Sequence, residues 1–163
     1  MIIAPKDFRD EELFDTKASL EEEGIDVIIA SKTRHEATGV LGRTVKPDLS
    51  LNDVVVDSYD AVIFVGGSGS SVYFNDEKAQ EIAKQASEKR KIVAAICIAP
   101  SILANAGILK GKQATAYASE ASNLRTKGAD YTGSPVTLCN KVITANGPTA
   151  AREFGKTIAE ELK

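Results

Sequence analysis

The chain has 163 residues, of which 43% are hydrophobic and 26% charged, proportions that favour one globular domain spanning residues 1–163. Its formal net charge of −3 excludes the basic stripe that attracts nucleic acid. No apolar run approaches the roughly 18 residues that cross a membrane, and the first residues lack the basic and apolar regions of a secretory signal.

Strand-like and helix-like stretches alternate along the first half of the chain. Ile2–Ala4 predicts a very short first strand, clipped at its start, and Asp10–Glu23 predicts a helix with acidic residues in its first turn. The β-branched run Ile25–Ala30 predicts a second strand. Residues 37–56 break the rhythm, and we expect a small hairpin over 39–45 and an excursion at the sheet edge over 51–56.

The second half continues the alternation, with short and wholly apolar strands. Predicted strands cover 61–65, 92–96, 113–117, 136–138 and 142–144, and predicted helices cover 76–89 and 99–106. A last helix opens at Gly147-Pro148, since proline suits the first helical position, and it carries an apolar stripe from Ala150 to Leu162. Alternation with short connections predicts an α/β fold, a mostly parallel sheet with helices on both faces.

Cys97 follows the apolar strand 92–96 and directly precedes a helix. This position is typical of a nucleophile elbow, in which small residues on either side, here Ala95 and Ala99, permit a sharp strand-to-helix turn. The positive end of the following helix would favour the thiolate. The alternative is a buried and inert cysteine that packs like a small hydrophobic residue.

Two other segments end at the same edge of such a sheet, where ligands bind. Gly66-Gly67-Ser68-Gly69 could present backbone N–H groups to an oxyanion, or it could be a simple turn. Glu12, in the first helix, should lie near the ends of the central strands, although carboxylates at a helix start also serve the helix dipole alone.

The remaining reactive side chains give weaker signals. His35, the only imidazole, lies in a polar loop and has the character of a surface residue, and Cys139 precedes a predicted hairpin turn. Two cysteines this far apart make no disulfide framework, so we expect a reducing, cytoplasmic compartment. One histidine and two cysteines argue against a structural zinc site, and we expect no metal and no cofactor.

These residues resemble the DJ-1/PfpI superfamily, whose fold is flavodoxin-like, a three-layer α/β sandwich. The strongest block is Val93–Ala104 with Cys97 at its centre, followed by Ala106–Lys112. Further similar blocks, in the family's order, are 7–13, 61–67 and 142–148.

The resemblance implies a role for each matching position. Cys97 falls on the family's reactive cysteine, and Glu12 falls on the carboxyl group that contacts its sulfur. The backbone N–H groups of Gly67 and Ile98 fall on the oxyanion-binding amides. Gly66 and Tyr117 fall on positions that line the pocket.

One departure from the family pattern bears on the reaction. In the protease-like branch a histidine directly follows the cysteine, but here the residue is Ile98, which cannot accept a proton. A Cys-His nucleophile needs its base within hydrogen-bond reach, so the sequence argues against peptidase activity. Ala99, where the family usually has glycine, is a second departure that crowds the elbow mildly.

Three functions stay open on this basis. The first is a cofactor-independent hydrolase of glyoxalase or deglycase type, acting on small reactive carbonyls or glycated adducts through Cys97 and Glu12. The second is a redox-sensing or stress-protective protein with an oxidisable Cys97, and the third is a chaperone-like protein in which Ile98 plugs the pocket. The resemblance further implies a homodimer or higher homo-oligomer, in which a neighbouring subunit could complete the site.

Overall fold

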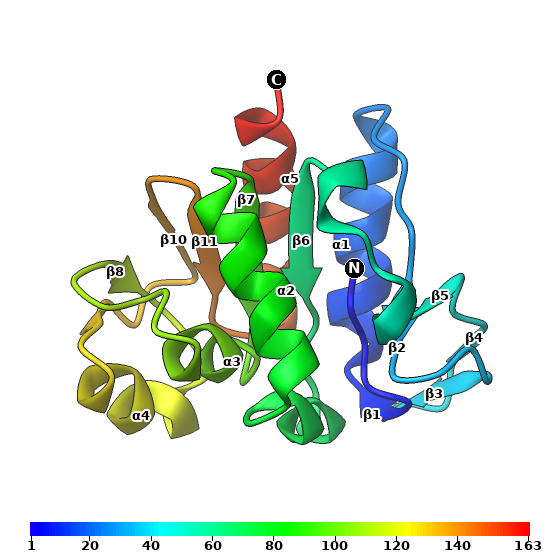
Figure 1. Ribbon diagram of the computed structural model, residues 1–163, viewed down its shortest axis with the longest axis horizontal. Coiled ribbons are helices and arrows are strands. Elements are labelled where there is room, and N and C mark those ends of the chain that lie inside the picture. Colours follow the sequence, from blue (N-terminus) through cyan, green and yellow to red (C-terminus); the bar gives the residue numbers. More distant parts are fainter.

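The computed structural model describes residues 1–163, and its helices and strands alternate as the sequence predicts (Figure 1). The α-helices are α1 (Asp10–Glu22), α2 (Glu77–Glu88), α3 (Pro100–Asn105), α4 (Ala121–Thr126) and α5 (Ala151–Glu161). The strands are β1 (Lys6–Phe8), β2 (Ala30–Ser31), β3 (Ala37–Gly39), β4 (Thr44–Val45), β5 (Leu49–Ser50), β6 (Ala61–Phe64), β7 (Ile92–Ile96), β8 (Gln113–Ala114), β9 (Asp130–Tyr131), β10 (Val136–Cys139) and β11 (Val142–Ala145). Five 3₁₀ turns complete the set: η1 (Leu51–Asp53), η2 (Val56–Ser58), η3 (Ser68–Tyr73), η4 (Ala118–Glu120) and η5 (Pro148–Ala150).

The central sheet is parallel except at one edge. Strands β6, β7 and β11 pair in parallel, and β10 pairs antiparallel with β11. On the other side of β6, Ile2 bridges to both Phe64 and Ala30 in parallel, and β2 then pairs with β5. This arrangement confirms the flavodoxin-like α/β fold.

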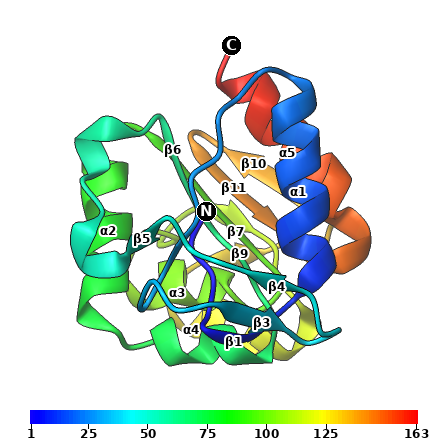
Figure 2. The same ribbon diagram turned by 90° about the vertical axis from the view of Figure 1, so that its right-hand side faces the viewer.

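Helices cover both faces of the sheet, as Figure 2 shows in side view. Helices α1 and α5 pack together on one face, and α2 and α3 lie on the other. Gly155 of α5 permits the close approach to α1, because a Cβ atom there would lie 2.7 Å from the Cβ of Ser19. Phe154 and Ile158 of α5 belong to the predicted apolar stripe, and both are fully buried. No helix is long and apolar enough to cross a membrane.

Several predicted elements are shorter or different in the structure. Of the predicted strand 25–30 only Ala30 is in a strand, and residues 25–28 line an open groove instead. Of the predicted strand 113–117 only Gln113 and Ala114 are paired. The hairpin over 39–45 is confirmed as β3 and β4, and the predicted excursion over 51–56 contains the 3₁₀ turn η1 and the start of η2.

Four elements lie outside the sequence prediction, among them β5, which pairs with β2. The short strand β1 pairs with β3, helix α4 follows the turn η4, and β9 pairs with β8. Each is two to six residues long, too short for a hydrophobic period to be read.

Candidate active site

Cys97 lies at the bend between β7 and α3, at the carboxyl edge of the sheet. Its φ angle is +64°, a left-handed conformation that costs a non-glycine residue about 1–3 kcal/mol. Two hydrogen bonds hold this bend: the Cys97 N–H donates to the Ala145 carbonyl (2.9 Å), and the Tyr117 N–H donates to the Cys97 carbonyl (2.8 Å). Only 9% of the residue is exposed, so the sulfur is held in one place and largely shielded from water.

Glu12 reaches the same edge from the first turn of α1. The segment before the helix packs against the turn after β6, where the Arg9 N–H donates to the Gly66 carbonyl (3.0 Å). The Glu12 side chain is fully buried, and neither of its carboxyl oxygens has a hydrogen-bond partner of good geometry. A buried carboxyl group without such partners is uncommon in folded proteins, and this one stands beside the cysteine.

Gly66 lies between the side chains of Glu12 and Cys97. A Cβ atom at Gly66 would lie 2.5 Å from Glu12 Oε1 and 2.6 Å from Cys97 Cβ. Real side-chain atoms do not approach so closely, so only glycine lets the carboxyl group and the thiol meet. The next residue, Gly67, has a φ angle of +98°, a left-handed conformation that favours glycine.

The environment raises the pKa of both groups. Burial raises the pKa of the Glu12 carboxyl from 4.5 to about 8, although the Cys97 thiol and the Gly66 backbone offset part of this effect. Burial is also the main cause that raises the pKa of Cys97 to about 12, and a charge on Glu12 adds to it. The backbone N–H groups of Gly67 and Ile98 act in the opposite direction by donating to the sulfur.

The resting site therefore differs from the thiolate that the sequence predicts. Helix α3 has only six residues and begins at Pro100, so its dipole is weak at Cys97 compared with the cost of burying a charge. At neutral pH the pair is a thiol beside a carboxylic acid. Such an acid can donate one proton and accept another, which suits it to move protons for the neighbouring sulfur.

The other predicted residues divide between the site and the rest of the molecule. Tyr117 is half exposed, and its ring lies near Gly147. Ile98 is partly buried against the same apolar cluster as Cys97. His35 is exposed, and its imidazole makes no hydrogen bond or ion pair within the chain. Cys139 is the last residue of β10, next to the hairpin turn at the opposite end of the sheet, and both cysteines are free.

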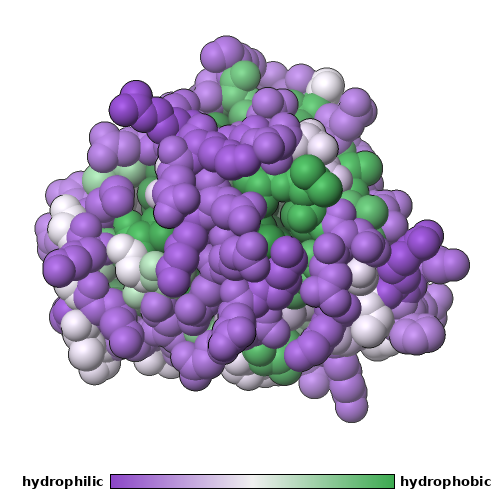
Figure 3. All heavy atoms as spheres, viewed as in Figure 1, coloured by the Kyte–Doolittle hydropathy of each residue, from purple (hydrophilic) through white to green (hydrophobic).

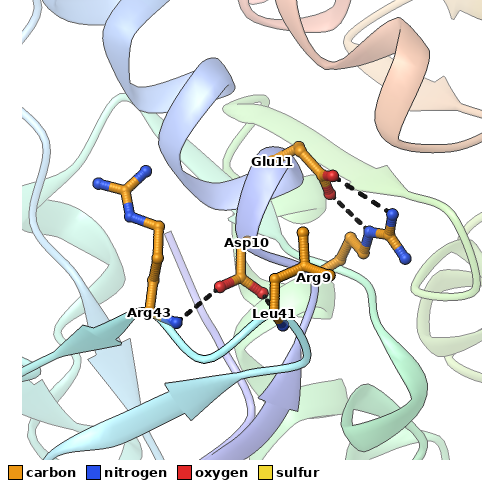
Figure 4. A network of polar contacts seen from close by, with 5 residues as sticks. All are labelled: Arg9, Asp10, Glu11, Leu41 and Arg43. Atoms are coloured by element: carbon orange, nitrogen blue, oxygen red, sulfur yellow. Dashed lines mark hydrogen bonds and ion pairs between the residues drawn. The ribbon is translucent and has the colours of Figure 1, made fainter.

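Arg9 is a residue at the site that the sequence analysis overlooked. Its guanidinium makes a bidentate contact with Glu11, with Nε to Oε2 at 2.5 Å and Nη2 to Oε1 at 3.3 Å (Figure 4). The hydrogen bond to the Glu11 carboxylate raises the pKa of Arg9. Charges on Glu12 and Cys97 raise this pKa further. The sequence could have indicated Arg9 only through its position before three acidic residues, and such charge runs also occur on ordinary helix surfaces.

No group of three or more His, Cys, Asp or Glu side chains is placed to hold a metal ion. The groups that the structure brings together at Cys97 are one sulfur, one carboxyl group and two backbone amides.

The comparisons of this chain with known proteins all indicate the same family. The model of the DJ-1/PfpI family matches residues 1–161. An uncharacterized protein of Methanocaldococcus jannaschii is 45% identical over all of this chain and 81% of its own length. A deglycase of Pyrococcus abyssi is 34% identical over 97% of this chain and 98% of its own. The crystal structure of a ThiJ/PfpI domain protein from Brachyspira murdochii superposes with a TM-score of 0.97 at 32% identity, covering 99% of this chain and 93% of that one.

Proposed function

Because the chain belongs to the DJ-1/PfpI family, we propose that it is a cofactor-independent hydrolase of reactive carbonyl compounds, of glyoxalase or deglycase type. The observation that carries the proposal is the contact between a buried, uncharged Glu12 and the Cys97 thiol across Gly66. The 34% identity to a protein named a deglycase supports the same reaction class.

The first step is addition of the thiol to an aldehyde. The Cys97 sulfur forms a bond to the carbonyl carbon, the C=O double bond becomes a single bond, and the oxygen gains a proton to give a hemithioacetal. Glu12 can supply that proton and accept the one that the thiol loses, so the carboxyl group ends the step unchanged. The N–H groups of Gly67 and Ile98 are the donors available to the negative charge that develops on sulfur and oxygen.

For a 2-oxoaldehyde such as methylglyoxal the remaining steps also balance. Glu12 must first release its own proton to water, which a pKa of about 8 allows for part of the molecules at neutral pH. The carboxylate then takes the proton from the hemithioacetal carbon and returns it to the neighbouring carbonyl carbon, while the hydroxyl proton of the first carbon passes to the oxygen of the second, which gives a lactate thioester. Water then cleaves the thioester and releases lactate and the free thiol. One carbon is oxidised and its neighbour is reduced, so no external oxidant or cofactor enters.

Peptide cleavage suits this site less well. The residue after Cys97 is Ile98, and His35 makes no side-chain contact within the chain that would bring it to the sulfur. In peptide cleavage a base beside the nucleophile first takes the nucleophile's proton. It then gives that proton to the amine that leaves.

The test is to incubate the protein with methylglyoxal and to follow lactate. Turnover is expected in the wild type and in Cys139→Ser, which is the matched control. Cys97→Ser should abolish it, and Glu12→Gln should lower it by roughly 10²–10⁴-fold, the usual contribution of a general acid-base group. Lactate formation at the same rate in Cys97→Ser, or none in the wild type, would rule the proposal out.

A second candidate function is oxidation of Cys97 to a sulfinic acid. It is favoured by the two N–H groups at the sulfur, which would stabilise the sulfinate oxygens. Two peroxide molecules supply the two oxygen atoms and leave as water. Mass spectrometry after mild peroxide should then show two added oxygens on Cys97 and none on Cys139, whereas equal modification of both cysteines would contradict a tuned site.

A further inference from the structure

Asn146 and Gly147 form the one Asn-Gly pair of the chain, and they directly follow β11. The backbone nitrogen of the residue after an asparagine can attack the side-chain carbonyl carbon of that asparagine, and a side chain on this residue hinders the attack. Glycine has no side chain, so the attack is least hindered at Asn146. The other asparagines precede Asp, Ala, Leu or Lys: Asn52, Asn75, Asn105, Asn123 and Asn140.

The peptide unit that joins Asn146 to Gly147 is not held by the rest of the fold. Neither the Asn146 carbonyl nor the Gly147 N–H makes a hydrogen bond within the chain. The groups on either side are held, since the Asn146 N–H donates to the Pro135 carbonyl (2.9 Å) and the Ala150 N–H donates to the Gly147 carbonyl (3.0 Å). This unit can therefore turn without breaking a hydrogen bond, which brings the Gly147 nitrogen toward the side chain of Asn146.

The surroundings of this pair leave room for a ring to form. A Cβ atom at Gly147 would have the Cδ2 atom of Tyr117 as its nearest neighbour, at 3.9 Å, which is an ordinary contact distance. Asn146 is partly exposed, so water can reach its side chain. In contrast, the side-chain amides of Asn105 and Asn123 donate hydrogen bonds within the fold, at 2.9 Å and 3.0 Å. Those bonds hold both amides away from the backbone nitrogen that follows.

The register of the sheet brings Asn146 beside Cys97. The parallel pairing of β11 with β7 ends where Ala145 lies opposite Ile96. Asn146 and Cys97 are the next residues of these two strands, and neighbouring strands lie about 4.8 Å apart. The Cys97 N–H donates to the Ala145 carbonyl (2.9 Å), and this carbonyl is bonded directly to the Asn146 nitrogen. A charge that forms at Asn146 therefore acts on the cysteine, and a longer main chain at Asn146 would disturb the bond that holds the Cys97 bend.

We propose that Asn146 and Gly147 form a self-modification site, at which Asn146 converts to aspartate and isoaspartate and thereby slows the chemistry of Cys97. The Gly147 nitrogen forms a bond to the side-chain carbonyl carbon of Asn146. The bond from that carbon to the amide nitrogen breaks, and the amide leaves as ammonia with the proton of the Gly147 N–H. Water then opens the cyclic imide at either of its carbonyl carbons. One opening gives aspartate, and the other gives isoaspartate, in which the main chain runs through the former side chain.

Both products carry a carboxylate near Cys97 and Glu12. A nearby negative charge disfavours a thiolate and a second carboxylate, so it raises the pKa of both groups. A charge on Glu12 already acts on Cys97 in this direction, and Glu11 does so on Glu12, whereas Arg9 lowers the pKa of Glu12. The modification should therefore reduce the thiolate fraction of Cys97 whether or not the protein turns over a carbonyl compound. Only a loss of turnover depends on the proposed function.

The test is to age the protein at mildly alkaline pH and to follow every asparagine by peptide mapping with mass spectrometry. Asn146 should be the first to gain the mass difference between an amide and an acid, in both the aspartate and the isoaspartate form. Iodoacetamide then measures the reactivity of Cys97 at neutral pH. The alkylation rate should fall by roughly three- to tenfold in the modified fraction, which corresponds to a pKa rise of about 0.5–1. The rate at Cys139, at the other end of the sheet, should stay unchanged in the same samples.

Variants separate the modification from general ageing. Asn146→Asp should alkylate slowly from the start, whereas Gly147→Ala should begin at the wild-type rate and keep it. Asn146→Gln, whose longer side chain closes a ring less readily, should also resist the reaction.

Three results would overturn the proposal. One is deamidation of Asn140, which is exposed in the β10–β11 turn, as fast as that of Asn146. Another is deamidation of Gly147→Ala at the wild-type rate. The third is alkylation of Cys97 in Asn146→Asp at the wild-type rate. Absence of lactate formation in the fresh wild type would instead overturn the proposed function alone, because peptide mapping and alkylation need no turnover.

Discussion

At the scale of single residues, burial has a larger effect than neighbouring charges on the pKa of Cys97 and of Glu12. Each group loses hydration, and each therefore keeps its proton to a higher pH. The neutral acid is useful to the proposed reaction because it can give a proton to a carbonyl oxygen. The same burial has a consequence for stability that can be measured without any substrate.

Glu12→Gln should stabilise the protein increasingly as the pH rises. The folded protein keeps the Glu12 proton up to about pH 8, whereas the unfolded chain releases it near 4.5, so unfolding gives up a proton between these values. The stability that Glu12 contributes is present below pH 4.5 and is lost as the pH rises to 8. The free energy of unfolding of Glu12→Gln relative to wild type should therefore grow by about 1.4 kcal/mol per pH unit in this window.

Urea unfolding at pH 5, 6, 7 and 8 measures this difference. The Met1 amine titrates with the opposite sign, since its pKa is lowered on folding, but it is common to both proteins and cancels. Glu11→Gln is the control, because Glu11 is a partly exposed partner of Arg9, and its difference from wild type should stay nearly flat above pH 5. A flat difference for Glu12→Gln would show that the carboxyl group is ionised in the fold.

Gly66→Ala tests whether glycine is required between the two side chains. The added methyl group would overlap Glu12 Oε1 and Cys97 Cβ, so we expect a loss of about 1–3 kcal/mol in stability and loss of carbonyl turnover. Gly147→Ala is the matched control: its Cβ would have no neighbour closer than 3.9 Å, and its φ of 165° is extended. Normal turnover in Gly66→Ala would show that the thiol and the carboxyl group need not meet.

At the scale of elements, α1 connects the site to the β3–β4 hairpin. The buried Asp10 carboxylate, two residues before Glu12, accepts hydrogen bonds from the N–H groups of Leu41 (2.8 Å) and Arg43 (2.9 Å) (Figure 4). The Arg43 guanidinium in turn lies 3.5 Å over the ring of Phe14. The start of α1 is thus held by a segment thirty residues away in the sequence.

Asp10→Ala should release this hairpin. Two backbone donors lose a charged acceptor, which costs roughly 1.5–3 kcal/mol for each such bond that water does not replace. In hydrogen exchange, the amides of Leu41 and Arg43 should exchange faster, while those of β7 keep their protection. Glu11→Ala serves as the control, since its pair with Arg9 is partly exposed and worth about 0–1 kcal/mol. Unchanged exchange at Leu41 in Asp10→Ala would contradict the role of this carboxylate.

The elements differ in how well the sequence predicts them, for a physical reason. Helices α1, α2 and α5 and strands β6 and β7 are long enough to show a hydrophobic period or a wholly apolar run, and they lie where predicted. Strand β1 has three residues with Asp7 at a φ of +61°, and its pairing with β3 comes from tertiary contact. No local pattern marks such an element.

At the scale of the whole molecule, the two edges of the sheet carry separate features. Cys97 lies where β7 ends, and an apolar groove lined by residues 25–28 and the start of β6 lies at the opposite edge of the sheet (Figure 3). A further feature is the tip of the β3–β4 hairpin, where Val40 and Leu41 are 44% and 60% exposed. Adjacent large apolar side chains that are exposed can form part of a contact surface.

We expect this tip to take part in self-association. Sedimentation velocity should give at least twice the protomer mass of 17.3 kDa for the wild type. Leu41→Lys should shift the population toward the protomer, because a charge in an apolar contact is costly, while Val55→Lys, also exposed but distant in sequence, should not. A wild type that sediments as a single protomer at micromolar concentration would contradict the expectation.

The sequence by itself determined the class of fold, the order of the main elements and the position of Cys97 at a strand-to-helix turn. These follow from hydrophobic periodicity and from small residues at a bend, which are local properties. The family resemblance already implied that Glu12 contacts the Cys97 sulfur, but only the tertiary structure decided how deeply both groups are buried, that Gly66 leaves room for them, and that burial raises the pKa of both. Burial and close approach depend on segments far apart in the chain, so the spacing of residues along the sequence could not reveal them.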